Sequence, residues 1–246
     1  MSRYGRPSAV SYSFGPGPMT PAVKVIIWAN IALFVVTLFY PPIVEYLGLV
    51  PEAVLERFSF WQLATYMFLH AGPLHILFNM LGVWMFGTDL ERLWGTRTFA
   101  KYYAITGVGA GVVAVAASFL PVGALQLTYS SVTIGASGAL YAILLAYAMR
   151  WPERPILLIL IPVPAKYFVM IYGALALLSV SDPRVSAAAH LGGLLVGYLY
   201  LKQVRFAGFT AEIKYRYLKW RMNRLRRKFD VYSGGKKEKD WDRHVH

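Results

Sequence analysis

The sequence predicts an all-α membrane protein with six transmembrane helices and both termini in the cytoplasm. Three observations lead to this prediction. Hydrophobic residues make up 57% of the 246 residues and charged residues only 15%, whereas a soluble domain is nearer a quarter charged. Apolar stretches long enough to cross a bilayer recur along the chain. The basic residues fall almost entirely on one side of these stretches, which sets their orientation.

The apolar stretches divide the chain into an arm, a core and a tail. Residues 1–22 are rich in Pro, Gly and Ser and are expected to form a flexible cytoplasmic arm. Residues 23–204 are the predicted six-helix core, and residues 205–246 are a basic cytoplasmic tail. The predicted spans are residues 25–44, 73–89, 98–120, 135–151, 165–181 and 185–201, because a helix needs about 17–25 mostly apolar residues to cross.

Two connections between the spans are unusual. Residues 41–72 are long and aromatic, and include Phe58, Trp61 and Tyr66. Because Trp and Tyr favour the membrane–water interface, this connection is expected to lie partly in the interface. The simpler interpretation of this connection is an aromatic membrane anchor that has no catalytic role. Residues 155–163 are apolar but too short to cross as a helix, so an interfacial stretch is expected there.

The net charge of +13 invites a nucleic-acid interpretation, but the placement of the charges argues against one. With both termini cytoplasmic, 23 of the 25 basic residues lie on the cytoplasmic side, and only Arg57 and Arg184 lie outside. That asymmetry is a topology signal, and no nucleic-acid partner is predicted. The composition also excludes a disordered chain, and the absence of Cys excludes a disulfide scaffold.

The tail carries 14 of the basic residues within residues 202–246. Its apolar residues recur at helical spacing at Leu218, Met222, Leu225 and Phe229. This pattern predicts an amphipathic helix on the anionic cytoplasmic leaflet of the bilayer, and a solvated basic tail is the alternative. The terminal His244 and His246 are not assigned to a metal site.

Four polar residues lie inside the apolar spans: His75, Asn79, Ser137 and His190. Polar and ionisable groups at membrane depth are costly and are functional candidates for that reason. The second, fourth and sixth spans all begin on the outer side. At about 1.5 Å per residue, His75, Ser137 and His190 all lie within about 10 Å of those outer ends. Three separate segments therefore bring polar groups to one layer.

The surroundings of these residues suggest acyl-transfer chemistry. Ser137 stands between Gly135 and Gly138, and small neighbours let backbone N–H groups approach a reacting carbonyl. His190 is next to a stripe of small residues that allows the sixth span to approach the fourth. Close packing alone, or a proton relay at His190, would also account for these residues.

His75 and Asn79 are four residues apart, so they share a helix face. Both can donate hydrogen bonds to a developing oxyanion, although a structural polar pair is the alternative. No Asp or Glu lies in the outer half of any predicted span. A Ser–His dyad, rather than a triad with a carboxylate, is therefore the arrangement available.

These residues resemble the rhomboid intramembrane serine proteases over about residues 24–204. The pieces stand in the family's order: His75-x-x-x-Asn79, Glu91-Arg92-x-x-Gly95, Gly135-x-Ser137-Gly138 and Ala189-His190-x-x-Gly193. The resemblance implies a six-helix rhomboid-like bundle. In it Ser137 is the nucleophile and His190 is the general base and acid, while His75, Asn79 and the Ser137 N–H form the oxyanion hole. The supporting residues that it implies are Gly135, Gly138, Tyr141 stacked on His190, and Gly193; Glu91 is expected to be structural.

The resemblance also implies the reaction. Such an enzyme hydrolyses peptide bonds of single-pass transmembrane substrates near the outer membrane face through an acyl-enzyme, with no cofactor or metal. Substrate entry between helices 2 and 5, a cap at residues 181–186, and a bacterial plasma-membrane location follow from the same resemblance. A pseudoprotease that binds membrane helices as a chaperone or trafficking factor, and a channel or transporter, are the alternative functions.

Overall fold

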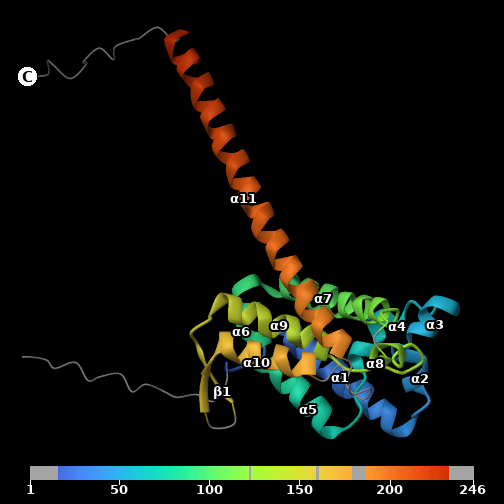
Figure 1. Ribbon diagram of the computed structural model, residues 1–246. Coiled ribbons are helices and arrows are strands. Elements are labelled where there is room, and N and C mark those ends of the chain that lie inside the picture. Colours follow the sequence, from blue (N-terminus) through green and yellow to red (C-terminus); the bar gives the residue numbers. More distant parts are fainter. Residues whose placement is uncertain (1–15, 122, 159–160, 179–186, 233–246) are drawn as a thin grey trace, which may run out of the picture. The chain divides into compact units, whose positions relative to one another are not determined.

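The computed structural model describes residues 16–121, 123–158, 161–178 and 187–232, and these are mostly helical (Figure 1). Contacts group the chain into two units, Met1–Tyr200 and Leu201–His246. The expected cap at residues 181–186 and the terminal histidines lie outside the described residues. The helical bundle that holds the candidate site belongs to the first unit.

A long helical segment occupies each of the six predicted ranges. They are α1 (Pro21–Phe39), the run α5 (Pro73–Gly82), η2 (Val83–Gly87) and α6 (Thr88–Trp94), α7 (Thr96–Ala117), α9 (Ser137–Arg150), α10 (Ala165–Leu178) and α11 (Ala187–Tyr232). In the described part, α1 and α7 are long and apolar enough to cross a membrane, and a bent pair of helices ending at Trp94 gives a third candidate. Because α9 and α10 have 14 residues each, or about 21 Å, the six crossings stay a prediction.

Local sequence explains where several of these helices begin and end. Pro21 and Pro73 stand at the first positions of α1 and α5, where the missing N–H has no intrahelical partner to lose. Gly95 separates α6 from α7 with a φ of 80°, a conformation that glycine adopts without strain. The turn at Gly95 lets α7 pack back against α6 and α9.

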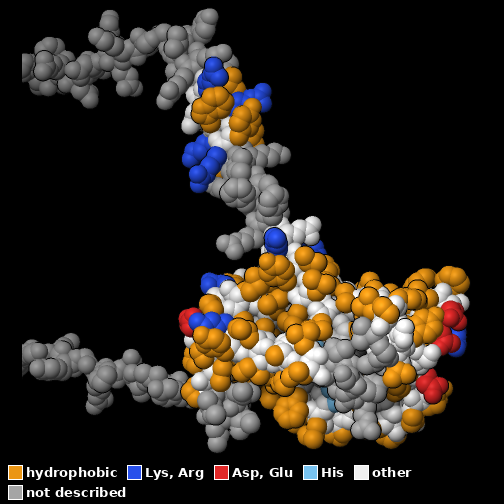
Figure 2. All heavy atoms as spheres, viewed as in Figure 1, with side chains coloured by type: hydrophobic (Ala, Val, Ile, Leu, Met, Phe, Trp, Pro, Cys, Tyr) orange, Lys and Arg blue, Asp and Glu red, His pale blue; other side chains and the backbone are white. Residues whose placement is uncertain are grey.

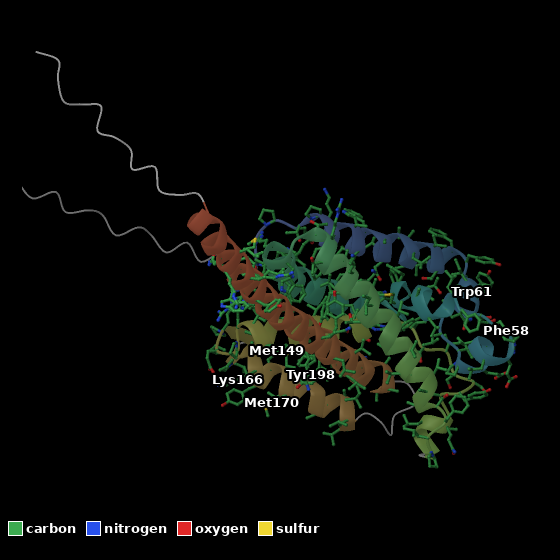
Figure 3. All side chains as sticks on the ribbon, turned by 90° about the horizontal axis from the view of Figure 1, so that it is seen from above. Phe58, Trp61, Met149, Lys166, Met170 and Tyr198 are labelled. Carbon is green, nitrogen blue, oxygen red and sulfur yellow. The ribbon has the colours of Figure 1, made fainter. Side chains whose placement is uncertain are left out.

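The connection at residues 41–72 is folded into short helices. These are α2 (Ile43–Leu47), α3 (Pro51–Glu56), α4 (Gln62–Thr65) and the 3₁₀ helix η1 (Tyr66–Phe68). The buried Gln62 organises them, because its Oε1 accepts from the Val50 N–H at 3.1 Å and its Nε2 donates to the carbonyls of Glu45 and Tyr46. Exposed Phe58 and Trp61 lie on the far side of the unit from Lys166 (Figure 3).

The stretch at residues 155–163 is not a helix, and its interfacial location stays a prediction. It forms a hairpin of β1 (Pro155–Leu158) and β2 (Ile161–Pro164), paired antiparallel with Pro155 opposite Pro164. The hairpin's base is closed by the Ala165 N–H on the Arg154 carbonyl at 3.0 Å. Two edge strands tolerate prolines, which have no N–H to contribute to a ladder. A short helix, α8 (Gly123–Gln126), lies between α7 and α9.

Glu91 joins α6 to the start of α1. Its carboxylate accepts hydrogen bonds from the Thr20 hydroxyl at 2.5 Å, from the N–H groups of Ala22 and Val23 at 2.9 Å each, and from the Thr96 hydroxyl at 2.8 Å. The N–H groups of a helix's first turn have no intrahelical acceptor and favour a negative charge. The expected structural tie through Glu91 is therefore confirmed.

The arm is anchored earlier than the expected boundary at residue 22. The Trp84 indole donates to the Gly17 carbonyl at 3.1 Å. Arg92 donates to the carbonyls of Pro16 and Pro18. The donors come from side chains more than 60 residues away in sequence, so the composition of the arm gave no sign of them.

The last helix is also longer than expected. The sequence predicts a span at residues 185–201 and an amphipathic helix that contains Leu218 to Phe229 in the tail, but α11 runs from Ala187 to Tyr232 without a break. No proline interrupts this range, so nothing removes a backbone donor from the helical hydrogen-bond ladder. The two predicted elements are parts of one helix.

The surface of the first unit is mostly apolar, and hydrophobic side chains cover much of the face seen in Figure 2. Many large apolar side chains are exposed, among them Trp28, Phe39, Leu77, Phe78, Met170 and Leu178. A soluble monomer rarely exposes an apolar surface of this extent. Such a surface suits contact with lipid.

Candidate active site

Ser137 is the first residue of α9, and the backbone before it is shaped by Gly135. The φ of Gly135 is 131°, a conformation that a residue with a Cβ rarely adopts. A Cβ at Gly135 would also lie 3.0 Å from the His75 Nε2 and 3.5 Å from the Ser137 Oγ. The Gly135 N–H donates to the Tyr66 carbonyl at 3.0 Å, which ties this turn to η1. Glycine is therefore required here both for conformation and for space.

The structure brings Ser137 and His190 together. His190 is the fourth residue of α11, and its Nε2 lies 2.7 Å from the Ser137 Oγ. The two helices can approach this closely because of Gly138 and Gly193. A Cβ on Gly193 would overlap the Gly138 carbonyl, and a Cβ on Gly138 would lie 3.3 Å from the Ala189 carbonyl oxygen of α11.

Tyr141 orients the His190 ring. The two rings stack with centroids 4.5 Å apart and planes inclined by 14°. The Tyr141 hydroxyl donates to the Tyr172 carbonyl at 3.4 Å. The His190 Nδ1 is buried and has no hydrogen-bond partner among the described residues. In the described structure the orientation of His190 therefore comes from stacking and from Ser137, not from a carboxylate.

His75 and Asn79 stand on the first two turns of α5, beside Ser137. The His75 Nδ1 accepts from the Ala71 N–H at 3.3 Å, so its ring proton is assigned to Nε2, the nitrogen near Gly135. The Asn79 Nδ2 donates to the His75 carbonyl at 2.8 Å and keeps a second hydrogen for another acceptor. Both side chains can therefore donate toward a group bound next to Ser137.

A cavity of about 520 Å³ joins these side chains. Its size is within the range of ligand sites in proteins. The walls come from α5, η2, α9, β1, α10 and α11, through His75, Phe78, Asn79, Leu81, Gly82, Met85, Phe86, Ser137, Leu140, Tyr141, Leu144, Ile156, Phe168, Tyr172 and His190. Five of the predicted site residues line this cavity, while Gly135, Gly138 and Gly193 allow the packing around it.

Residues of α10, β1 and the connection at residues 41–72 also lie near the site. Phe168 and Tyr172 of α10 and Ile156 of β1 form an apolar wall. The buried His70 meets the His75 ring edge to face at 5.0 Å. The Tyr66 hydroxyl donates to the Gly107 carbonyl at 2.7 Å, behind Gly138. The sequence indicated Tyr66 and His70 only as part of the aromatic connection, without a role in the site, and it gave no indication of Phe168, Tyr172 or Ile156.

The chain is similar to known proteins. Residues 57–205 match a protein-family model described as "Rhomboid domain". The chain is 28% identical over 185 residues to "Rhomboid protease GlpG" of Pectobacterium atrosepticum, covering 74% of this chain and 61% of that protein. It is 30% identical over 141 residues to "Putative rhomboid protease YdcA" of Bacillus subtilis, covering 57% of this chain and 65% of that protein.

A mitochondrial protein is also among the relatives. The chain is 31% identical over 137 residues to "Rhomboid protein 1, mitochondrial" of Saccharomyces cerevisiae, covering 54% of this chain and 38% of that protein. The chain therefore spans less than two thirds of the length of the curated relatives described here.

Proposed function

The chain belongs to the rhomboid family, and from this premise we propose that it is an intramembrane serine protease with Ser137 as nucleophile and His190 as general base and acid. Membership of the family makes it a membrane protein. The observation that carries the proposal is the 2.7 Å contact between the Ser137 Oγ and the His190 Nε2 beside a cavity. A nucleophile in hydrogen-bond reach of its base is the arrangement that acyl transfer needs.

The first half of the reaction forms the acyl-enzyme. The Ser137 Oγ attacks the substrate carbonyl carbon while its proton passes to the His190 Nε2. The carbonyl oxygen becomes an oxyanion, and donors from His75, Asn79 and the Ser137 N–H stabilise it. When this intermediate collapses, the C–N bond breaks and His190 gives its proton to the leaving amine. The new amino terminus departs and the acyl group stays on Ser137.

The second half restores the enzyme. A water molecule attacks the acyl carbon and loses a proton to the His190 Nε2. The ester bond to Ser137 then breaks, and the Ser137 Oγ takes the proton back. The cavity beside the dyad supplies the space that water needs within an apolar bundle.

The proposed substrates are single-pass membrane proteins cleaved near the outer face. A helical substrate has its carbonyls occupied by its own hydrogen bonds, so a segment that leaves its helix easily is the preferred target. The distribution of basic residues supports six crossings with both termini in the cytoplasm. A bacterial plasma membrane is the proposed location.

The test is serine labelling together with cleavage. The purified protein should react with a fluorophosphonate and cleave a model single-pass substrate in liposomes, and Ser137→Ala should lose both. Ser131→Ala is the matched control, because the Ser131 hydroxyl is exposed and donates to the Leu127 carbonyl outside the cavity. Labelling of Ser137→Ala at the wild-type level would refute the assignment. Binding of the substrate helix by the wild type without cleavage would instead identify a pseudoprotease.

A further inference from the structure

The part of α11 in the second unit carries an exposed apolar stripe. Tyr215, Leu218, Met222 and Leu225 are spaced by three, four and three residues, which puts them on one face of the helix. Their exposed fractions are 58%, 42%, 56% and 46%. Four large apolar side chains therefore line one face of this segment in contact with solvent.

The same segment is strongly basic. Residues 213–229 contain eight Lys or Arg and no Asp or Glu. Lys219 lies over the Tyr215 ring at 5.9 Å, and Arg224 lies over the Trp220 ring at 5.4 Å. Figure 2 shows hydrophobic and basic side chains together on the described part of this segment. Their mixture suits a partner that is apolar at depth and anionic at its surface.

The three-and-four spacing is also the spacing of a coiled coil. A second copy of the chain is therefore an alternative partner for the apolar stripe. In a coiled coil the positions beside the seam face the partner helix. Here those positions are residues 214, 219, 221, 226 and 228, and all are Lys or Arg. Two copies would therefore oppose like charges along the whole interface, with no acidic residue to relieve them.

A nucleic acid would satisfy the basic residues but leave the apolar stripe in water. An anionic bilayer uses both, because apolar side chains enter the acyl boundary while Lys and Arg reach the lipid phosphates. We propose that residues 215–225 bind the anionic surface of the bilayer, with Tyr215, Leu218, Met222 and Leu225 inserted.

The absence of Cys in the chain makes a site-specific probe possible. Met222→Cys and Asn223→Cys are each labelled with an environment-sensitive fluorophore on the full-length protein. The two exposed positions differ by one residue and by about 100° around the helix. Each protein is reconstituted in vesicles of phosphatidylcholine alone, and in vesicles with about 30% phosphatidylserine. Both leaflets have the same lipids, so the orientation of insertion does not affect the result.

The expected result is a severalfold rise in emission with a blue shift at position 222 in the anionic vesicles only. Position 223 should change much less. Replacing Lys219, Arg221 and Arg224 by Gln should lower the bound fraction, since each basic residue near the surface contributes about fivefold in partition. Fluorophosphonate labelling should be unchanged in this triple variant, which separates this proposal from the proposed function.

Three outcomes would overturn the proposal. Equal spectra at positions 222 and 223 in anionic vesicles would mean that the stripe does not insert. Energy transfer between differently labelled copies that falls on dilution would identify a second copy as the occupant. A shift produced in neutral vesicles by an added oligonucleotide, and not by phosphatidylserine, would identify nucleic acid.

Discussion

Two polar clusters in the bundle differ in how completely their atoms are hydrogen-bonded. The Glu91 carboxylate is 2% exposed and accepts from two hydroxyl and two backbone donors. At the candidate site the His190 Nδ1 and the Asn79 Oδ1 are buried with no partner among the described residues. The first cluster has little capacity left for another molecule. The cluster at the candidate site has hydrogen-bonding atoms without a partner, and these atoms lie beside a cavity.

The difference separates polar residues that hold a membrane bundle together from those that can act on a substrate. A buried polar group without a partner is expensive, so a fully bonded network stabilises the fold. An incompletely bonded network lowers stability unless a ligand or water completes it. Unsatisfied polar atoms beside a cavity are therefore a better indication of function than polarity alone.

The largest expected effect is at His190. His190→Gln should lower the rate of substrate cleavage by at least about 10⁴-fold, because the amide cannot take the proton from Ser137. Thermal unfolding in detergent should change little, since the side chain has few bonds to lose. A variant that keeps a tenth of the wild-type rate would show that His190 is not the base.

Asn79 comes next, and Asn30 offers a matched control. Each side chain is a buried amide that donates to the carbonyl one turn earlier at 2.8 Å, but only Asn79 lines the cavity. Asn79→Ala should lower kcat by about 10²- to 10³-fold with little change in KM, as for the loss of an oxyanion donor. Asn30→Ala should leave kcat close to that of the wild type. Equal losses in the two variants would make Asn79 a structural residue.

Glu91→Gln tests the other side of the comparison. The neutral amide accepts fewer and weaker hydrogen bonds, so the free energy of unfolding should fall by about 2–3 kcal/mol. The cleavage rate of the folded enzyme should stay within about threefold of the wild type. Heating in detergent followed by size-exclusion chromatography measures the stability. A large loss of rate without a loss of stability would contradict the structural role.

The smallest expected effect is at Tyr141. Tyr141→Leu removes the stacking on His190, which is worth about 1 kcal/mol for aromatic pairs, and should lower the cleavage rate about fivefold. Tyr141→Phe keeps the stacked ring and should behave like the wild type. Parallel measurements of kcat on the two variants decide this. If the Phe variant lost as much activity as the Leu variant, the hydroxyl of Tyr141, rather than its stacked ring, would support the cleavage rate.

Much of the site could be predicted because its polar residues stand out against an apolar chain. His75, Asn79, Ser137 and His190 were conspicuous for that reason, and the small residues around them indicated close packing. Phe168 and Tyr172 could not be found in this way, because an apolar residue on an apolar helix has the same signature whether it faces lipid or a cavity. The hairpin was missed since an apolar run of a few residues suits either an interfacial segment or a strand.

The sequence by itself determined the class of protein, the approximate positions of the six long helical segments and the residues that carry the proposed chemistry. These follow from local properties, since the preference of a segment for an apolar environment is a sum over neighbouring residues. Only the tertiary structure decided that Ser137 meets His190, that Glu91 holds the start of α1, and that residues 16–18 are anchored by Trp84 and Arg92. Each of these contacts joins residues more than 50 positions apart. Their geometry depends on how closely helices can pack, as at Gly138 and Gly193, and that is a property of the pair rather than of either segment.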